Sequence, residues 1–284
     1  MMDQSEKAAH FEALHERPGT FVIPNPWDAG SARVLSSMGF EALATTSAGL
    51  AFSLGRRDAE GALTRDDILT NAKAIVDATD LPVSADLENG FGQSPDEVAE
   101  TIRRAASVGL VGGSIEDATG SPDKPIYDLS HAVERITAAA EAAREFPFRF
   151  MVVARCENFS VKRDDLEDTI RRLQAFERAG ADVLYAPALP DLDAIRTVCA
   201  SVGKPVNVVM GFGGGLYPVQ TLAEAGVKRI SIGGSFARAA LAGLARAARE
   251  VRDHGTFTYV EEAMPFSEAN GYMAPVSRKS ESDS

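Results

Sequence analysis

The sequence has few cysteines and no long hydrophobic run. Cys156 and Cys199 are its only cysteines among 284 residues, and the N-terminal segment MMDQSEKAAH lacks the apolar stretch of a secretory signal. No segment approaches the roughly 18 uninterrupted apolar residues that a membrane-spanning helix needs. These absences argue against a disulfide-stabilised secreted protein and a membrane protein, so we expect a soluble protein of the reducing cytoplasm.

Basic residues are also in short supply. The chain has 29 lysines and arginines against 41 aspartates and glutamates, a formal net charge of -12. Because this charge repels phosphate backbones and anionic membrane surfaces, we expect neither a nucleic acid nor a membrane as a partner. The apolar share of 45% is that of an ordinary globular protein with a large core. Because the net charge is negative, an anionic substrate would need a local metal ion or arginine to hold it.

Short apolar runs alternate along the chain with longer stretches of helical periodicity. After a helix expected at 5–15, eight runs, each followed by a helical stretch, occupy 20–24, 42–47, 82–88, 113–117, 150–157, 182–187, 205–210 and 229–233. Such alternation is typical of βαβ units and a parallel sheet. The count of eight favours an α/β fold of the (β/α)8 TIM-barrel type.

Local motifs agree with a single barrel. The segments TRDD, from Thr64, and SPDE, from Ser94, match capping boxes and predict two helix starts. The segment after the first run reads NPWDAG and lacks the G-x-G-x-x-G of an open dinucleotide-binding sheet. We expect residues 1–274 to form one barrel domain, ending in a helix over 236–252, and residues 275–284 to be a loose polar tail.

Acidic residues gather at the ends of the third to fifth runs, where barrel enzymes carry their reactive groups. The third run ends in Asp86 and Glu88, the fourth in Glu116 and the fifth in Arg155. Because residues two apart on a strand face the same way, Asp86 and Glu88 are expected on one face, and so are Arg155 and Glu157. Cys156 is then expected to point away from the site. Carboxylates with a nearby arginine suit Mg2+, which prefers oxygen ligands. Zinc is not expected, because no histidine lies at a strand end.

Simpler interpretations exist for each of these features. Each carboxylate taken alone fits a helix cap or a turn equally well. Together with Arg155 they favour a functional site, since burying like charges is costly without a cation. The segment ATTSAG at 44–49 combines small hydroxyl residues with glycine and could admit an oxyanion, or could be a solvated loop. The glycine-rich segments 211–215 and 233–235 could be anion-binding nests or only turns.

Five motifs, taken in order, resemble the isocitrate lyase/phosphoenolpyruvate mutase superfamily. They are TTS at 45–47, LGRRD at 54–58, DLENGFG at 86–92, SIED at 114–117 and VAR at 153–155. The most specific of them are the acidic third run with its Gly-Phe-Gly ending and the Glu-Asp pair of the fourth run. The resemblance implies a barrel whose eighth helix is swapped between the subunits of a homotetramer, arranged as a dimer of dimers.

The resemblance also implies a set of ligands and site residues. Mg2+, with Mn2+ as an alternative, would be held directly or through water by Asp58, Asp86, Glu88 and Glu116. The catalytic residues would be Arg155, Glu116 and Asp58. The substrate, a small 2-oxo or 2-hydroxy acid, would be bound by Thr45, Thr46, Ser47, Asp86, Arg155 and Asn207. The metal would stabilise the charge that develops on the 2-oxo oxygen of an enolate.

The loop after the fourth run departs from the family pattern. Isocitrate and methylisocitrate lyases carry a Cys-Gly-His motif there, with the cysteine as the acid, whereas this loop reads DATGSPDKPIY from Asp117 to Tyr127. Neither of those two activities is therefore expected. Phosphonate-handling members place a lysine and an asparagine on this loop, and here Lys124 is present without the asparagine. Glu88 also replaces the usual second aspartate, which lengthens one ligand arm by a methylene.

These departures leave carbon–carbon bond chemistry. We expect a Mg2+-dependent lyase that decarboxylates oxaloacetate, or cleaves a related 2-oxo or 2-hydroxy acid by a retro-aldol step, through a metal-stabilised enolate. Tyr127, Tyr185 or a metal-bound water would supply the proton. Two alternatives stay open. One is phosphorus–carbon chemistry of the phosphoenolpyruvate mutase or phosphonopyruvate hydrolase type, in which Lys124 folds over the site; the other is a non-catalytic barrel that only binds 2-oxo acids.

Overall fold

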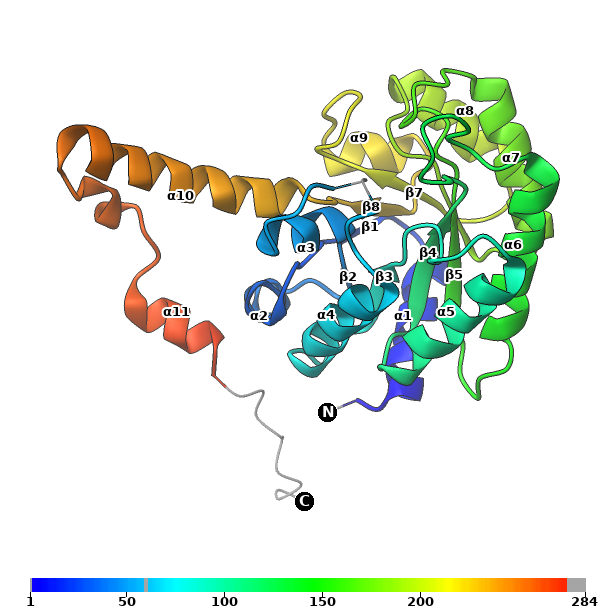
Figure 1. Cartoon of the computed structure of the whole chain (residues 1–284). Coiled ribbons are helices and arrows are strands. Elements are labelled where there is room, and N and C mark those ends of the chain that lie inside the picture. Colours follow the sequence, from blue (N-terminus) through cyan, green and yellow to red (C-terminus); the bar gives the residue numbers. More distant parts are fainter. Residues whose placement is uncertain (1, 59–60, 275–284) are drawn as a thin grey trace.

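The computed structural model describes residues 2–58 and 61–274. Its centre is one sheet in which every neighbouring pair of strands runs parallel, in the order β1-β8-β7-β6-β5-β4-β3-β2. Helices alternate with the strands around the outside (Figure 1), so the predicted (β/α)8 TIM barrel is confirmed. The strands are β1 Phe21–Ile23, β2 Leu43–Ala44, β3 Val83–Asp86, β4 Gly112–Glu116, β5 Met151–Arg155, β6 Val183–Tyr185, β7 Val206–Val209 and β8 Arg229–Ser231.

The two end strands of this order, β1 and β2, come together and leave the barrel nearly closed. The Ala44 N–H donates to the Pro24 carbonyl at 3.0 Å. The side-chain amide of Asn25 donates to the Thr45 carbonyl, also at 3.0 Å. Both bonds join the segments that directly follow or belong to the end strands, so the seam is held at the carboxyl ends of β1 and β2.

Amphipathic helices form the outer layer. On α5, Val98, Ile102 and Ala105 are fully buried at helical spacing, which is the pattern of a helix that covers a sheet. The capping boxes predicted at Thr64 and Ser94 are present at the starts of α4 and α5. The helices are α1 Gln4–Glu16, α2 Ala29–Ser37, α3 Ser47–Ser53, α4 Arg65–Asp77, α5 Pro95–Ser107, α6 Leu129–Ala143, α7 Leu166–Arg178, α8 Leu192–Ser201, α9 Val219–Glu224, α10 Ser235–His254 and α11 Phe266–Tyr272, with a 3-10 helix η1 at Thr258–Glu261.

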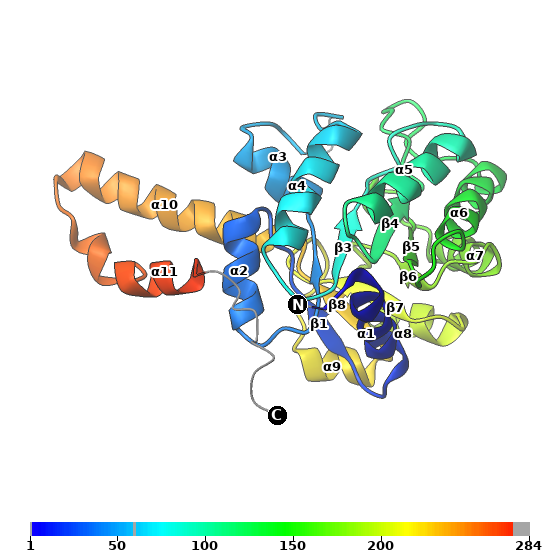
Figure 2. The same ribbon diagram turned by 90° about the horizontal axis from the view of Figure 1, so that it is seen from below.

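The helix α1 closes the end of the barrel at which the strands begin (Figure 2). Its residues Phe11 and Leu14 are buried in a hydrophobic cluster with Ile23, Val153 and Val183, which come from the inner faces of the strands. A larger hydrophobic cluster fills the space between the sheet and the surrounding helices. Because α1 packs this end of the barrel, the interior is accessible from the carboxyl ends of the strands.

The helix α10 extends away from the barrel, and the chain returns through η1 and α11 toward α2 (Figure 1). The end of the returning segment is bound to α2, because the guanidinium of Arg33 donates to the carbonyl of Met273 at 3.0 Å. Large apolar side chains stay in solvent along this arm, with Leu244 67% and Phe266 83% exposed. The segment α10 to α11 is therefore an apolar arm that the barrel of its own chain does not cover.

The C-terminal predictions are only partly covered by the structure. The helix predicted at 236–252 is confirmed, since α10 runs from Ser235 to His254. The loose tail predicted at 275–284 lies outside the described residues. Within residues 2–58 and 61–274, none of the helices is long and apolar enough to cross a membrane.

Candidate active site

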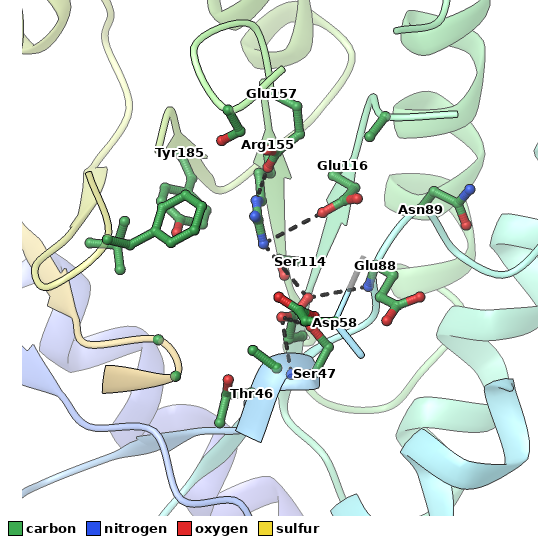
Figure 3. A pocket seen from close by; sticks show the side chains of 18 of the residues that line it. Thr46, Ser47, Asp58, Glu88, Asn89, Ser114, Glu116, Arg155, Glu157 and Tyr185 are labelled. Atoms are coloured by element: carbon green, nitrogen blue, oxygen red, sulfur yellow. Dashed lines mark hydrogen bonds and ion pairs between the residues drawn. The ribbon is translucent and has the colours of Figure 1, made fainter. Parts of the chain in front are cut away.

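A cavity of about 710 Å³ lies at the carboxyl ends of the strands. Figure 3 shows side chains from several strands and loops converging on it. The residues predicted as metal ligands, substrate ligands or catalytic groups all line this cavity: Thr45, Thr46, Ser47, Asp58, Asp86, Glu88, Glu116, Arg155 and Asn207. Their predicted roles as metal ligands, substrate ligands or catalytic groups stay predictions.

Asp86, the last residue of β3, is held by a set of hydrogen bonds. The Ser47 hydroxyl donates to its Oδ2 at 2.9 Å, and the Glu88 N–H donates to its Oδ1 at 3.2 Å. The Asp86 N–H in turn donates to the Thr45 hydroxyl at 3.0 Å. These bonds come from the β2–α3 junction and from the chain after β3, so the position of the carboxylate is fixed by two neighbouring strands.

Glu88 reaches the cavity by a different route from the one predicted. The strand β3 ends at Asp86, and Glu88 has a left-handed backbone with φ 47°. Strand alternation therefore does not apply to this pair, and a turn rather than a shared strand face brings both carboxylates to the cavity. Burial, together with the negative charges of Asp86 and Asp58, raises the pKa of Glu88 to about 7, and the positive charge of Arg155 opposes this shift.

Arg155, the last residue of β5, lies among carboxylates (Figure 3). Its Nη1 is 3.5 Å from Glu116 Oε2 and 3.8 Å from Asp86 Oδ1. Its Nε donates to Glu157 Oε1, and its guanidinium carbon lies 5.0 Å from the centre of the Tyr185 ring. Burial raises the pKa of Glu116 well above its usual range, which Arg155 opposes and the neighbouring carboxylates reinforce.

Glu157, expected on the same strand face as Arg155, is part of the site although it was not among the predicted site residues. It is buried, lines the cavity and binds Arg155. Its N–H donates to Asp117 Oδ1 at 2.8 Å, and Asp117 Oδ2 accepts from Arg172 Nη1 at 3.1 Å. Its position two residues after Arg155 was the available signal. Cys156, between them, is buried in the outer cluster, as predicted for a residue that points away from the site.

The hydroxyl-rich segment after β2 is a helix start and not a solvated loop. Thr46 is the N-cap of α3, and its hydroxyl accepts a hydrogen bond from the Gly49 N–H at 3.3 Å. Thr45 and Thr46 are both buried. The helix begins so early that β2 contains only Leu43–Ala44, which is shorter than the run predicted at 42–47. The alternative of a solvated loop is therefore wrong.

The loop that follows β4 lines the cavity with small residues and proline. Its ends are joined by a bridge between Ala118 and Ile126. Lys124 is exposed, pairs with the Asp128 carboxylate, and is not among the residues that line the cavity. Tyr127 packs against Arg135, whose guanidinium carbon lies 4.3 Å from the centre of the Tyr127 ring. Tyr127 does not line the cavity either. Of the two tyrosines predicted as proton donors, the one on the cavity wall is Tyr185.

The acidic side of the cavity can be tested for its fit to Mg2+. Among residues 2–58 and 61–274, no group of three or more histidine, cysteine, aspartate or glutamate side chains is arranged to hold a metal ion. Mg2+ keeps several waters and is often bound through one or two carboxylates, so a hydrated ion needs fewer direct ligands. Burial raises the pKa of Glu88 and of Glu116, neighbouring carboxylates add to both shifts, and a cation would relieve the part due to like charges. The donors fit a hydrated Mg2+ near Asp86.

Comparison with known proteins identifies the family. The family described as phosphoenolpyruvate phosphomutase matches residues 11–252, which is most of the chain. The chain belongs to this family. Within the wider isocitrate lyase/phosphoenolpyruvate mutase superfamily, it is 32% identical to the 2-methylisocitrate lyase of Escherichia coli K12 over 203 residues, which cover 69% of this chain and 67% of that protein.

Two solved structures agree with this assignment. A proposed lyase/mutase of Burkholderia cenocepacia J2315 is 57% identical, with a TM-score of 0.93 and coverage of 96% of this chain and 97% of that chain. The structure of a 2,3-dimethylmalate lyase is 27% identical, with a TM-score of 0.86 and coverage of 97% and 96%. The superfamily recognised from the sequence is therefore confirmed, and relatives named as lyases make an enzyme the expected kind of protein.

Proposed function

We propose that this protein is a Mg2+-dependent lyase that breaks a carbon–carbon bond in a small 2-oxo or 2-hydroxy acid. The observation that carries the proposal is the meeting of Asp86, Glu116 and Arg155 on one cavity wall at the carboxyl ends of neighbouring strands. The relatives support it, because 2-methylisocitrate and 2,3-dimethylmalate, after which two of them are named, are small hydroxy acids. An oxaloacetate decarboxylation or a retro-aldol cleavage is the reaction we favour.

Arg155 would orient the substrate. A guanidinium carries five N–H donors, so Arg155 can bind a substrate carboxylate while it keeps its contacts with Glu116 and Glu157. When bound, Mg2+ would supply positive charge beside the 2-oxo oxygen, where the charge of an enolate develops. The hydroxyls of Thr46 and Ser47 lie on the same cavity wall and are available to the substrate's other oxygens.

Tyr185 is our candidate for the proton donor. In a decarboxylation, the bond to the departing carboxylate breaks, CO2 leaves, and the electron pair remains as an enolate that must take up one proton at carbon. Burial raises the pKa of Tyr185 to about 12, so its hydroxyl keeps its proton at neutral pH and can deliver it to a more basic carbon. Neither a cysteine nor a histidine of the described residues lines the cavity to compete for this role.

A substrate panel tests the proposal directly. The full chain is incubated with Mg2+ and, separately, oxaloacetate, 2-methylisocitrate, 2,3-dimethylmalate and phosphonopyruvate, and the release of 2-oxo acid, CO2 or phosphate is followed. We expect turnover of a carbon–carbon substrate that stops with EDTA and returns with added Mg2+. If phosphonopyruvate alone turns over, the chemistry is at phosphorus. If nothing turns over and EDTA leaves 2-oxo acid binding unchanged, the metal-dependent lyase is wrong.

We also propose that the apolar arm formed by α10 to α11 packs against a second copy of this chain in a homo-oligomer. The arm leaves Leu244, Phe257 and Phe266 more than half exposed, and a large apolar surface left in solvent is typical of subunit contacts. Light scattering during size-exclusion chromatography tests this. We expect a multimer for the native chain and a smaller particle for the Leu244→Arg, Phe266→Arg double variant. A native monomer contradicts the proposal.

A further inference from the structure

A second arginine lies inside the barrel, and nothing in the proposed reaction uses it. Arg229 is the first residue of β8, is only 4% exposed, and lines the same cavity as the acidic residues. Its Nε donates to the side-chain oxygen of Asn207 at 2.8 Å. Its Nη1 is buried and has no hydrogen-bond partner among residues 2–58 and 61–274. A buried guanidinium with an unused donor is uncommon, because the unmade hydrogen bond costs free energy.

The charge of Arg229 is also unmatched. No carboxylate in the described parts of the chain forms an ion pair with it, whereas Arg155 and Arg172 each have at least two such partners. Burial lowers the pKa of Arg229 to about 10. His15 of α1 lies close to Arg229 and is buried. Burial and the charge of Arg229 together lower the pKa of His15 to about 3. An uncharged imidazole does not neutralise the guanidinium.

Strand register connects Arg229 to the acidic side of the cavity. Arg155 pairs with Tyr185, Tyr185 pairs with Asn207, and Asn207 pairs with Arg229. Residues paired across parallel strands face the same side of a sheet, so these four side chains form one row inside the barrel. The row begins at the end of β5 and finishes at the start of β8, which puts Arg155 near the carboxylates and Arg229 deeper in the barrel.

We propose that Arg229 binds a second carboxylate of the substrate, so that the site selects small dicarboxylic acids over monocarboxylic acids. The proposal rests on the proposed function, because it concerns the substrate of that same cavity. Arg155 is already paired with Asp86, Glu116 and Glu157, so its remaining N–H donors can orient one substrate carboxylate but leave a second carboxylate without a cation. Arg229 has no carboxylate partner in the part of the chain that the structure describes. A substrate anion next to it would supply both the missing negative charge and the missing hydrogen-bond acceptor.

The test compares two hydroxy acids that differ by one carboxylate. Racemic malate and racemic lactate are titrated calorimetrically into the native chain and into Arg229→Met, with Mg2+ present throughout. We expect the native chain to bind malate at least about 10-fold more tightly than lactate, as for one charge-assisted contact. In Arg229→Met this preference is lost, while the affinity for lactate changes less than about 2-fold.

Thermal unfolding without ligand separates a binding role from a structural one. Arg172 serves as the matched control, because it is a buried arginine with carboxylate partners in Asp117 and Asp168. Arg172→Met should lower Tm. Arg229→Met removes an uncompensated buried charge and should raise Tm by about 2–4 °C. Arg229→Gln, which keeps a polar head, is the second variant if the methionine variant does not fold.

The possible results are distinct. If the native chain binds neither acid, the proposed function and this proposal both fail. If the native chain prefers malate and Arg229→Met keeps that preference, the role of Arg229 is wrong and the proposed function stands. If both Arg229 variants unfold, or lose Tm as Arg172→Met does, Arg229 is a structural residue and the proposal is overturned. Loss of the malate preference in a variant at least as stable as the native chain supports it.

Discussion

Two buried arginines on one row of the barrel show how differently the same side chain can be used. Arg155 lies among Asp86, Glu116 and Glu157. Arg229 has the neutral Asn207 as its hydrogen-bond partner and no paired carboxylate among the described residues. The first region has an excess of negative charge and suits a cation, whereas the second has an excess of positive charge and suits an anion. The cavity is therefore polarised along its depth, which matches an acid bound through a metal at one end.

The largest effect is expected from removing Arg155, the arginine that is paired with carboxylates. Arg155→Met leaves the surrounding carboxylates without their partner, and breaking a buried ion pair costs about 3–5 kcal/mol of unfolding free energy. Substrate orientation is lost as well, so we expect kcat/KM to fall by about 10³-fold. Urea unfolding and steady-state kinetics measure the two effects. A variant of native stability would show that the charges around Arg155 are not coupled to it.

The next effect concerns the cation site itself. Asp86→Asn keeps the shape of the side chain but removes the charge at the centre of the predicted metal site. We expect calorimetric Mg2+ affinity to fall by at least about 10-fold and activity by about 100-fold. Asp193→Asn, an exposed change on α8, is the control and should leave both quantities unchanged. Equal Mg2+ affinity in the two variants would remove Asp86 from the metal site.

Tyr185 lies between the two arginines on the row and is the proposed proton donor. Tyr185→Phe removes the proposed proton donor with little change of volume. General acid catalysis contributes about 10²–10⁴-fold, so we expect kcat to fall by about 100-fold while KM changes little. Rapid-quench measurement of CO2 release against 2-oxo acid formation locates the step. A native kcat would leave water as the donor.

The low pKa of His15, due to burial and to the nearby Arg229, predicts a pH dependence of stability. The folded pKa of about 3 lies below the unfolded value of about 6.5, so below that value the unfolded chain binds the additional proton. The contribution of the uncharged His15 to the free energy of unfolding is fully present above pH 6.5. It falls by about 1.4 kcal/mol per pH unit as the pH drops toward 3. His15→Leu should flatten this slope, and the exposed change His254→Leu should not. Urea unfolding between pH 4 and 7 measures it, and an unchanged slope in His15→Leu would contradict the assignment.

The smallest effect is expected at Lys124. Its ammonium pairs with Asp128 in solvent and is not on the cavity wall, so Lys124→Ala should change carbon–carbon cleavage less than about 2-fold. The same variant is assayed with phosphonopyruvate. A large loss of activity toward either substrate would show that the loop moves Lys124 over the site, and would favour phosphorus–carbon chemistry.

Much of the site could be predicted because it depends on local order along the chain. A parallel barrel places the end of every strand at one rim, so Asp86, Glu116 and Arg155 could be grouped before any contact was known. Glu88 was grouped correctly for the wrong reason, because a left-handed turn after β3 replaces the expected strand alternation. Glu157 was missed as a site residue, although its spacing from Arg155 pointed to it.

The sequence by itself determined the alternation of strands and helices, the family and the acidic rim, since these follow from short-range spacing and from motifs. Only the tertiary structure decided that Arg229 belongs with them. A single arginine at the start of an apolar run at 229–233 carries no information about its neighbours. Its place on the row with Asn207 and Tyr185 depends on the register between strands that are far apart in the sequence, and that register exists only once the barrel closes.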